Sequence, residues 1–361
     1  MSATQSAAAF LGGAAAAQAS APGRVNLLGE HTDYNDGFML PLATPQRTEV
    51  LLASSGDGQH HAYSATLGMG VTFAPASRAP EGFARYLEGC IRLVEQHGAT
   101  VPPLRIYVRS NVPPGVGLAS SAALEVAMLR ALRVLLGLEL DNLTVARLAQ
   151  RAEIEFAGVH CGIMDQMAAS LGAARRMLFI DARSLAWRLV ALPARSEVVV
   201  VDSGVVRTLA ASDYNLRRAE CREAARMLGV AALRDVDPPS SVEALASPWR
   251  ERARHVVSEN LRVREAADGV DGVRFGALMN DSHASLRDDF AVSLPQLDRL
   301  CVCLRAQRGV FGARLTGAGF GGACVALCEA GQGAAVAAGA LACYGASGHV
   351  LMPAPSRLEG A

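Results

Sequence analysis

Hydrophobic and polar residues follow two periodicities along this chain, and each predicts a different kind of element. Residues 104–109 alternate apolar and polar side chains, as a strand with one buried face requires. From Ser120 to Leu136 the apolar residues recur at helical spacing, and Gly137 is typical of a helix end. The same patterns predict strands at 21–28, 48–53, 177–181, 198–201, 311–316, 323–328 and 348–352, and helices at 143–157, 163–171 and 332–343.

The predicted elements follow one another without regular strand–helix–strand alternation, so the fold class is α+β. The chain is mostly helical from Ser212 to about Arg308, and a break containing a proline lies at 192–196. We therefore expect two domains, residues 1–192 and 193–345. A last strand within about 346–361 is a candidate to complete the first domain.

Composition removes several classes of chemistry. Of the 361 residues, 51% are hydrophobic and 19% are charged, which is typical of a globular protein. The 34 basic residues balance 34 acidic ones, so we expect no general attraction to nucleic acid or to a membrane. All 34 basic residues are arginine. Without lysine there is no Schiff-base residue and no Walker A motif, so another group must neutralise any bound phosphate.

The cysteines and histidines suggest structural positions. Eight scattered cysteines without a C-x-x-C pair predict free, mostly buried thiols in a reducing cytoplasm. The alanine-rich start lacks the basic residues of a signal peptide, and no apolar run reaches the ~18 residues of a membrane span. We expect His60 and His61 in a loop, and His283 and the charged stretch 250–265 at surface or hydrogen-bonded positions.

Ionisable residues are dense just after the first predicted strand. Arg24 lies on that strand, and the following turn carries Glu30, His31 and Asp33, which makes four ionisable side chains within ten residues. Carboxylates beside a histidine suit a polyol, because each sugar hydroxyl both donates and accepts hydrogen bonds. An ordinary charged loop is the alternative, and the density of charge favours binding.

The segment from Pro113 to Ala123 places glycines directly before a predicted helix. The free N–H groups and the dipole at a helix N-terminus attract anions, so this segment can cradle phosphate without lysine. Ser121 is a candidate ligand of Mg²⁺. A plain helix start after a Pro-Gly turn is the simpler interpretation of this segment taken alone.

Two further positions are ambiguous in isolation. Asp165 lies among apolar residues, where a carboxylate is either a catalytic base or a helix cap. Ser212 is placed to cap a helix, and Tyr214 either packs or offers its hydroxyl to a ligand.

A second glycine-rich segment matches G-x-G-x-x-G at Gly317, Gly319 and Gly322. The dinucleotide interpretation requires a following helix and an acidic residue about 20 positions on. Here a strand-like run follows, so we reject that interpretation. We expect two strands joined by a glycine turn that closes on a ligand.

Together and in this order, the motifs resemble the galactokinase family of the GHMP small-molecule kinase superfamily. The run from Gly23 to Gly37 is close to specific for that family, and the similarity extends from about residue 20 to beyond 350. The resemblance implies an N-terminal ribosomal-protein-S5-like domain and a C-terminal ferredoxin-like domain. It also implies a cytoplasmic monomer that uses ATP and Mg²⁺ to phosphorylate the anomeric C1 hydroxyl of α-D-galactose.

The resemblance carries roles onto matching residues. Arg24 would stabilise the transition state and Asp165 would be the general base. Sugar binding is implied for Glu30, His31, Thr32, Asp33 and Tyr214. Phosphate binding is implied for Gly115, Val116, Gly117, Leu118, Ala119, Ser120 and Ser121, and Mg²⁺ binding for Ser121 and Glu153. Ala318 stands where the family has glycine, which matters only if that position needs a positive φ.

Two alternatives stay open on the same fold. One is a kinase for a related sugar such as N-acetylgalactosamine or arabinose; a uronate is disfavoured, because its carboxylate would repel Glu30. The other is a non-catalytic galactose and ATP sensor. Sensors of this kind have lost a Ser-Ala pair that this chain keeps at Ser121-Ala122, so the enzyme is favoured.

Overall fold

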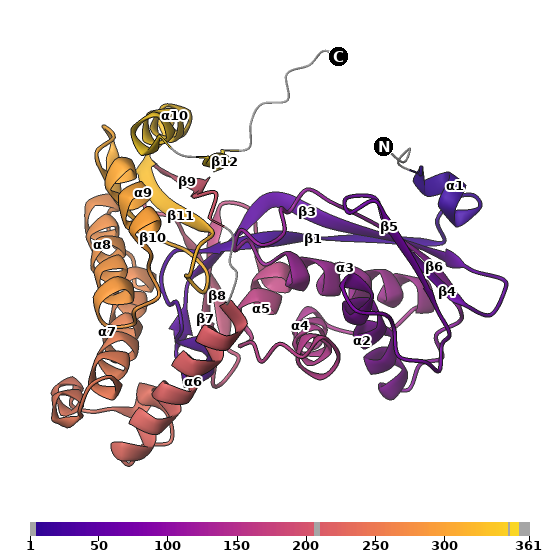
Figure 1. Cartoon of the computed structure of the whole chain (residues 1–361), viewed down its shortest axis with the longest axis horizontal. Helices are drawn as coiled ribbons and strands as arrows, with labels where there is room; N and C mark the ends of the chain where they lie inside the picture. Colours follow the sequence, from indigo (N-terminus) through magenta and orange to yellow (C-terminus); the bar gives the residue numbers. More distant parts are fainter. Residues whose placement is uncertain (1–4, 206–209, 346, 354–361) are drawn as a thin grey trace. The chain divides into compact units, whose positions relative to one another are not determined.

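A computed structural model describes residues 5–205, 210–345 and 347–353 (Figure 1). The chain forms two compact units, each built from several segments. Unit 1 comprises Met1–Arg24, Thr44–Pro114 and Ala119–Leu171, and unit 2 comprises Val25–Ala43, Gly115–Leu118 and Gly172–Ala361. No helix among the described residues is long and apolar enough to cross a lipid bilayer.

Unit 1 is a sheet covered by helices. Its strands are β1 (Ala17–Asn26), β3 (Pro41–Ser54), β4 (His60–Ser64), β5 (Met69–Phe73) and β6 (Leu104–Ser110). Strand β3 pairs with β1 and lies antiparallel to β6, β6 lies parallel to β4, and β4 lies antiparallel to β5. The helices are α1 (Ala7–Leu11), α2 (Phe83–Gln96), α3 (Ser120–Leu136), α4 (Asn142–Ala152) and α5 (Met164–Leu171), with a π-helical turn at Glu153–Ala157.

The core of unit 1 follows from the periodicity of these elements. Inward residues of the strands, such as Leu52 and Ile106, are fully buried against α2 and α3 residues such as Leu87 and Met128. Figure 1 shows α2, α3 and α4 on one face of this sheet. The core thereby fixes the start of α3 against the ends of the strands.

Unit 2 contains a four-stranded antiparallel sheet in the order β10-β11-β9-β12. The strands are β9 (Ser196–Asp202), β10 (Val310–Leu315), β11 (Ala323–Glu329) and β12 (His349–Met352). The helices are α6 (Ala210–Met227), α7 (Trp249–Ala267), α8 (Gly272–Asp288), α9 (Pro295–Arg305) and α10 (Gly333–Tyr344). Short strands β2 (Phe38–Met39), β7 (Arg176–Asp181) and β8 (Trp187–Ala191) pair in the order β2-β7-β8.

Most predicted elements lie within a few residues of the observed ones, but several short elements and the longer helix α2 were not predicted. These are α1, α2, β2, β4, β5 and β8. The expectation of a loop at His60 and His61 is wrong, because both residues lie in β4. Strand β4 lacks a clear apolar alternation and exists because it pairs with β6. His60 is buried there, and its Nδ1 accepts a hydrogen bond from the Leu104 amide at 3.1 Å.

Two other predictions differ from the observed structure. Strand β12 pairs with β9, so residues 349–352 do not complete the N-terminal domain as expected. Helix α6 already includes Ala210 and Ala211, so Ser212 is inside the helix, and its side chain lies outside the described part of the chain. The predicted domain boundary at residue 192 remains a prediction.

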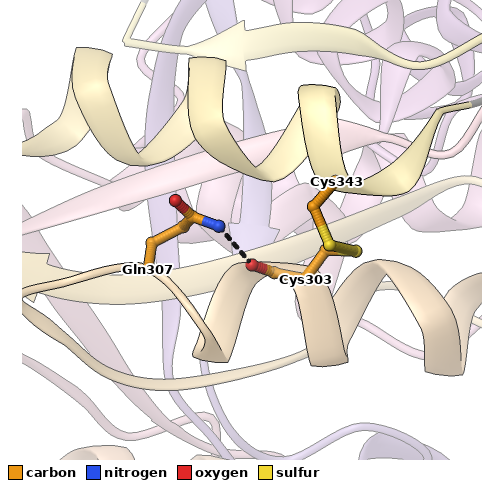
Figure 2. The surroundings of a disulfide bond; sticks show 3 residues. All are labelled: Cys303, Gln307 and Cys343. Atoms are coloured by element: carbon orange, nitrogen blue, oxygen red, sulfur yellow. Dashed lines mark hydrogen bonds between the residues drawn. A yellow bond between two sulfur atoms is a disulfide. The ribbon is translucent and has the colours of Figure 1, made fainter.

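The expectation that all cysteines are free is wrong for one pair. A disulfide joins Cys303 of α9 to Cys343 of α10, two helices of unit 2 (Figure 2). The Gln307 side-chain amide donates to the carbonyl of Cys303 beside it. The other six cysteines are free, and five of them are buried.

Candidate active site

Arg24 and Asp165 form a partly buried ion pair in unit 1. Arg24 Nε donates to Asp165 Oδ1 at 2.8 Å, and Nη2 donates to Oδ2 at 2.8 Å, so the pair is bidentate. Asp165 is in the first turn of α5, and its carboxylate binds an arginine. The Arg24 side chain is only 6% exposed, whereas that of Asp165 is 29% exposed. The guanidinium therefore orients a carboxylate that a ligand can still reach.

Two side chains in unit 1 form a candidate cation site. Ser121 Oγ, in the first turn of α3, lies 2.9 Å from Glu153 Oε1. The Gln166 side-chain amide donates to the other oxygen of Glu153 at 2.6 Å. Burial, and secondly the carboxylate of Asp165, raise the pKa of Glu153 to about 7. The surroundings of the Glu153 carboxylate thus hold too little positive charge to balance its negative charge.

The residues present fit Mg²⁺. Glu125 lies one helical turn after Ser121, and neither of its oxygens has a hydrogen-bond partner among the described residues. Burial and the neighbouring Glu153 raise the pKa of Glu125 well above its usual range. Buried carboxylates without compensating charge are expected where a cation binds. The described residues contain no group of three or more metal-ligating side chains, and Mg²⁺ tolerates this because it keeps water and phosphate ligands.

The glycine loop before α3 has the conformation of an anion cradle. Gly115 and Gly117 adopt positive φ of 78° and 89°, and α3 begins at Ser120. Ala119 precedes the helix in the left-handed region with φ 57° and makes no side-chain cap. The first-turn N–H groups of a helix have no intrahelical acceptor, so they point toward the loop.

A cavity of about 270 Å³ lies within unit 1 beside the helix start. Its lining includes apolar side chains of Phe83, Tyr86 and Val112, together with Ser120 and Ser121. An apolar cavity ending at a helix N-terminus can take a flat base at one end and anions at the other.

In unit 2, Glu30 is buried and binds the second glycine-rich turn. The Gly317 amide donates to its Oε1 at 2.6 Å, and the Asn26 side chain donates to its Oε2 at 2.9 Å. Arg314 Nη2 lies 3.4 Å from Oε1. Gly317 joins β10 to β11, so the expected strand–turn–strand is confirmed. Ala318 does not adopt positive φ, and its departure from glycine is therefore harmless.

His31, the residue after Glu30, packs against aromatic side chains. Burial lowers the pKa of His31 to about 3, so its ring is neutral. Its Nε2 lies 3.1 Å from the carbonyl of Ala318 and therefore carries the proton, while Nδ1 accepts from the Tyr34 hydroxyl at 2.8 Å. Tyr214 of α6 packs against both rings, with centroids 5.7 Å from His31 and 5.4 Å from Tyr34. The structure thus brings together His31 and Tyr214, two of the residues that the resemblance implies for sugar binding.

Thr32 and Asp33 differ in how available they are. The Thr32 hydroxyl is fully buried and lies 2.9 Å from the carbonyl oxygen of Gly29 and 2.7 Å from that of Phe38. This arrangement closes the loop. Asp33 is half-buried, and one of its oxygens accepts from the Tyr34 amide at 3.0 Å.

Sequence reasoning missed the residues that hold these groups in place. Arg314, Glu259 and His255 are completely buried. Glu259 and His255 are hydrogen-bonded, as expected for part of 250–265, but neither they nor Arg314 had an assigned role. His283 is buried with its Nδ1 accepting from the Leu315 amide, which agrees with the expectation of a hydrogen-bonded position. A charged helix such as α7 gives no sign in its sequence of which charges face inward. The three buried residues became recognisable only through their contacts.

Comparisons with known proteins match three sections of the chain. The galactokinase galactose-binding signature matches residues 8–54, the GHMP kinases N terminal domain matches 85–173 and the GHMP kinases C terminal model matches 264–346. A galactokinase from Roseiflexus sp. (strain RS-1) is 46% identical over 322 residues, covering 86% of this chain and 82% of the relative.

Solved structures agree. The crystal structure of Lactococcus lactis galactokinase complexed with galactose matches with a TM-score of 0.86 at 30% identity and covers 92% of both chains. A mevalonate kinase from Methanococcus jannaschii matches with a TM-score of 0.68 at 17% identity, covering 92% of this chain and 96% of its own. The second match concerns the fold alone.

Proposed function

The chain belongs to the galactokinase family of GHMP kinases, and from this premise we propose that it transfers the γ-phosphoryl group of ATP to the C1 hydroxyl of α-D-galactose. The observation that carries the proposal is the Arg24–Asp165 pair. It presents a bidentately held carboxylate that keeps 29% of its side-chain surface exposed. A reaction that removes a hydroxyl proton needs such a group within reach of its substrate.

In the proposed reaction, Asp165 accepts the proton of the C1 hydroxyl while the sugar oxygen bonds to the γ-phosphorus. The bond from that phosphorus to the bridging oxygen of the β-phosphate breaks, and ADP leaves. Arg24 holds Asp165 in one orientation and offsets negative charge near the transferring group. Positioning and charge neutralisation provide most of the rate enhancement in phosphoryl transfer, and proton transfer contributes typically ~10²–10⁴-fold.

The N–H groups at the start of α3 and the loop from Gly115 to Leu118 would bind the phosphates of ATP. The apolar cavity beside Ser120 suits the adenine ring. Ser121 and Glu153 would hold Mg²⁺, and the bound ion would supply positive charge that offsets the charge of the phosphates. This assignment is supported by the oxygen donors 2.9 Å apart and by the raised pKa of Glu153.

Of the five residues that the resemblance implies for sugar binding, we propose Glu30, Asp33 and Tyr214 as the residues that contact the sugar. Glu30 accepts hydrogen bonds from the Gly317 amide and the Asn26 side chain, and its carboxylate is the kind of acceptor that a sugar hydroxyl needs. His31 and Thr32 use their polar atoms on protein partners. We propose that they act mainly by fixing Tyr34 and the loop.

ADP release with a panel of sugars, ATP and Mg²⁺ tests the proposal. We expect turnover with galactose to exceed turnover with N-acetylgalactosamine, arabinose and glucose. Release with one of the other sugars alone would reassign the acceptor. Galactose binding without any ADP release would favour the sensor. A monomer is also proposed, and light scattering would check it; the cytoplasmic location remains a prediction.

A further inference from the structure

Helix α7 presents three buried polar side chains to one segment of backbone in unit 2. His255 Nε2 lies 3.1 Å from the carbonyl oxygen of Glu30, and Glu259 Oε1 accepts from the Gly29 amide at 2.8 Å. Asn260 Oδ1 accepts from the Phe38 amide at 2.9 Å. Glu259 lies one helical turn after His255 and Asn260 follows it directly, so one short stretch of α7 binds both ends of the sugar-binding loop.

Glu259 is the centre of this arrangement. Its side chain is fully buried, and its Oε1 also accepts from the Ser282 hydroxyl at 2.7 Å. Arg262 Nε donates to Oε2 at 2.6 Å. The guanidinium groups of Arg262 and Arg314 and the hydrogen bonds outweigh the effect of burial, and they hold the pKa of Glu259 well below its usual range. A fully buried carboxylate that stays charged binds its partners more strongly than a neutral group would.

Arg314 connects Glu259 to the proposed sugar ligand Glu30. Its Nη1 lies 3.5 Å from Glu259 Oε1, and its Nη2 lies 3.4 Å from Glu30 Oε1. Nη1 also donates to the carbonyl of Leu27 at 3.1 Å. One guanidinium therefore contacts both carboxylates and the backbone of the loop. Arg314 is itself completely buried, so water does not weaken these contacts.

The backbone geometry explains why a side-chain template is needed. Gly29 adopts φ 95°, and a Cβ there would lie 2.5 Å from the Phe38 carbonyl oxygen. The loop thus folds closely on itself at Gly29, in a conformation that only the surrounding contacts select. Glu259 binds the amide of Gly29, the residue at which the chain turns.

We propose that Glu259 is a positioning residue for sugar binding: through the Gly29 amide and Arg314 it fixes the loop that carries Glu30 and His31. The inference rests on the proposed function of that loop. Glu259 does not touch the substrate and takes no part in proton transfer. Its loss should therefore weaken galactose binding far more than it weakens ATP binding or slows the chemical step.

The test compares three variants of the full chain. Glu259→Gln keeps the shape of the side chain and removes its charge, and Ser282→Ala removes one hydrogen bond to it. Glu265→Gln is the matched control, because Glu265 lies on the same helix but forms an exposed ion pair with Arg274. Galactose affinity is measured by calorimetry without ATP, and KM for galactose and for ATP by ADP release.

We expect the galactose dissociation constant and KM to rise about tenfold or more in Glu259→Gln, because small displacements of binding groups are costly. For Ser282→Ala we expect a rise of about threefold, as for loss of one hydrogen bond. KM for ATP should stay within about twofold in both variants, and Glu265→Gln should match the wild type. If Glu259→Gln does not fold, Ser282→Ala carries the test.

A double variant sharpens the result. If Glu259 acts through Glu30, then Glu259→Gln combined with Glu30→Gln should weaken binding by less than the product of the two single effects. Unchanged galactose affinity in folded variants, or an equal rise in KM for both substrates, would overturn the inference alone. A wild-type chain that binds no galactose would instead overturn the proposed function on which it rests.

Discussion

Two arginine–carboxylate pairs in this chain have the same chemistry and opposite surroundings. Arg24–Asp165 leaves 29% of its carboxylate side chain exposed, whereas Arg314 and Glu259 are both fully buried. In the exposed pair, Arg24–Asp165, the bidentate hydrogen bonds orient the carboxylate, and part of its surface remains accessible to a reactant. In the buried pair, Arg314–Glu259, the charged groups bind backbone groups such as the Gly29 amide. Exposure, and not residue type, separates a proposed catalytic pair from a positioning pair.

The two glycine-rich turns repeat this contrast. A Cβ at Gly115 would meet nothing within 4 Å, so the first turn leaves space for a ligand. A Cβ at Gly319 would lie 2.4 Å from the Val292 carbonyl oxygen, and one at Gly321 would lie 2.7 Å from that of Val205. Glycine gives the first turn an open concave backbone and gives the second turn close packing against protein.

The largest effect should come from the exposed pair. Asp165→Asn keeps the shape of the side chain and removes its ability to take a proton, so kcat should fall by about 10²–10⁴-fold. Coupled ADP release measures this loss, and thermal unfolding should show a folded variant. Asp281→Asn, at an exposed position of α8, is the control. Substantial turnover in Asp165→Asn would show that Asp165 orients the hydroxyl without acting as a base.

For stability, the larger effect should come from the buried pair and the smaller effect from the exposed pair. Arg314→Met leaves Glu259 and Glu30 buried without their shared counter-charge, and we expect the free energy of unfolding to fall by about 3–5 kcal/mol. Arg24→Met leaves a carboxylate that water can reach, so the loss should be about 1–2 kcal/mol. Urea unfolding followed by circular dichroism measures both. An equal loss in the two variants would contradict the contrast between the pairs.

The buried histidines of unit 2 should make stability depend on pH, against an opposite contribution from Glu153 in unit 1, whose pKa is raised to about 7. Burial lowers the pKa of His255 to about 4, from its ordinary 6.5, and that of His31 to about 3. Below pH 6.5 the unfolded chain binds protons at these rings and the folded chain does not, so the contribution of these rings to the free energy of unfolding falls as pH falls. Each ring should contribute about 2 kcal/mol of this loss between pH 6.5 and 5.

His255→Gln isolates one ring. The difference in unfolding free energy between variant and wild type should shift in favour of the variant as the pH falls from 7 to 5, whatever its value at pH 7. Urea titrations at half-unit pH steps measure the slope. Parallel curves for the two proteins would mean that His255 becomes protonated in the folded state.

The smallest effect on stability should come from Ala119, the residue before helix α3. Ala119 adopts φ 57°, which costs a residue with a Cβ about 1 kcal/mol, so Ala119→Gly should relieve this strain. The greater freedom of glycine in the unfolded chain offsets part of the gain, and the net stabilisation should be below about 1 kcal/mol. Gly115→Ala, at φ 78°, should shift stability in the opposite direction. Urea unfolding of both variants checks the two signs.

Much of the fold could be predicted from periodicity alone. Helix α3 was predicted with both its ends, because its apolar spacing is regular and Gly137 follows it. The GHMP kinase fold implied by the motifs is confirmed by the comparisons. Strands β4 and β5 were not predicted, since their residues become strand-like only by pairing with distant partners. The Cys303–Cys343 disulfide was also beyond reach, because the scattered spacing of the cysteines does not reveal their pairing.

For the site, the sequence by itself determined which reactive side chains are present and the order in which they occur. It placed Arg24 on a strand, Asp165 at a helix start and a glycine loop before α3, because these depend on local propensity and spacing. Only the tertiary structure decided which charges are exposed and which are sealed. Burial and counter-charge depend on residues far apart in sequence, as Glu30, Glu259 and Arg314 are.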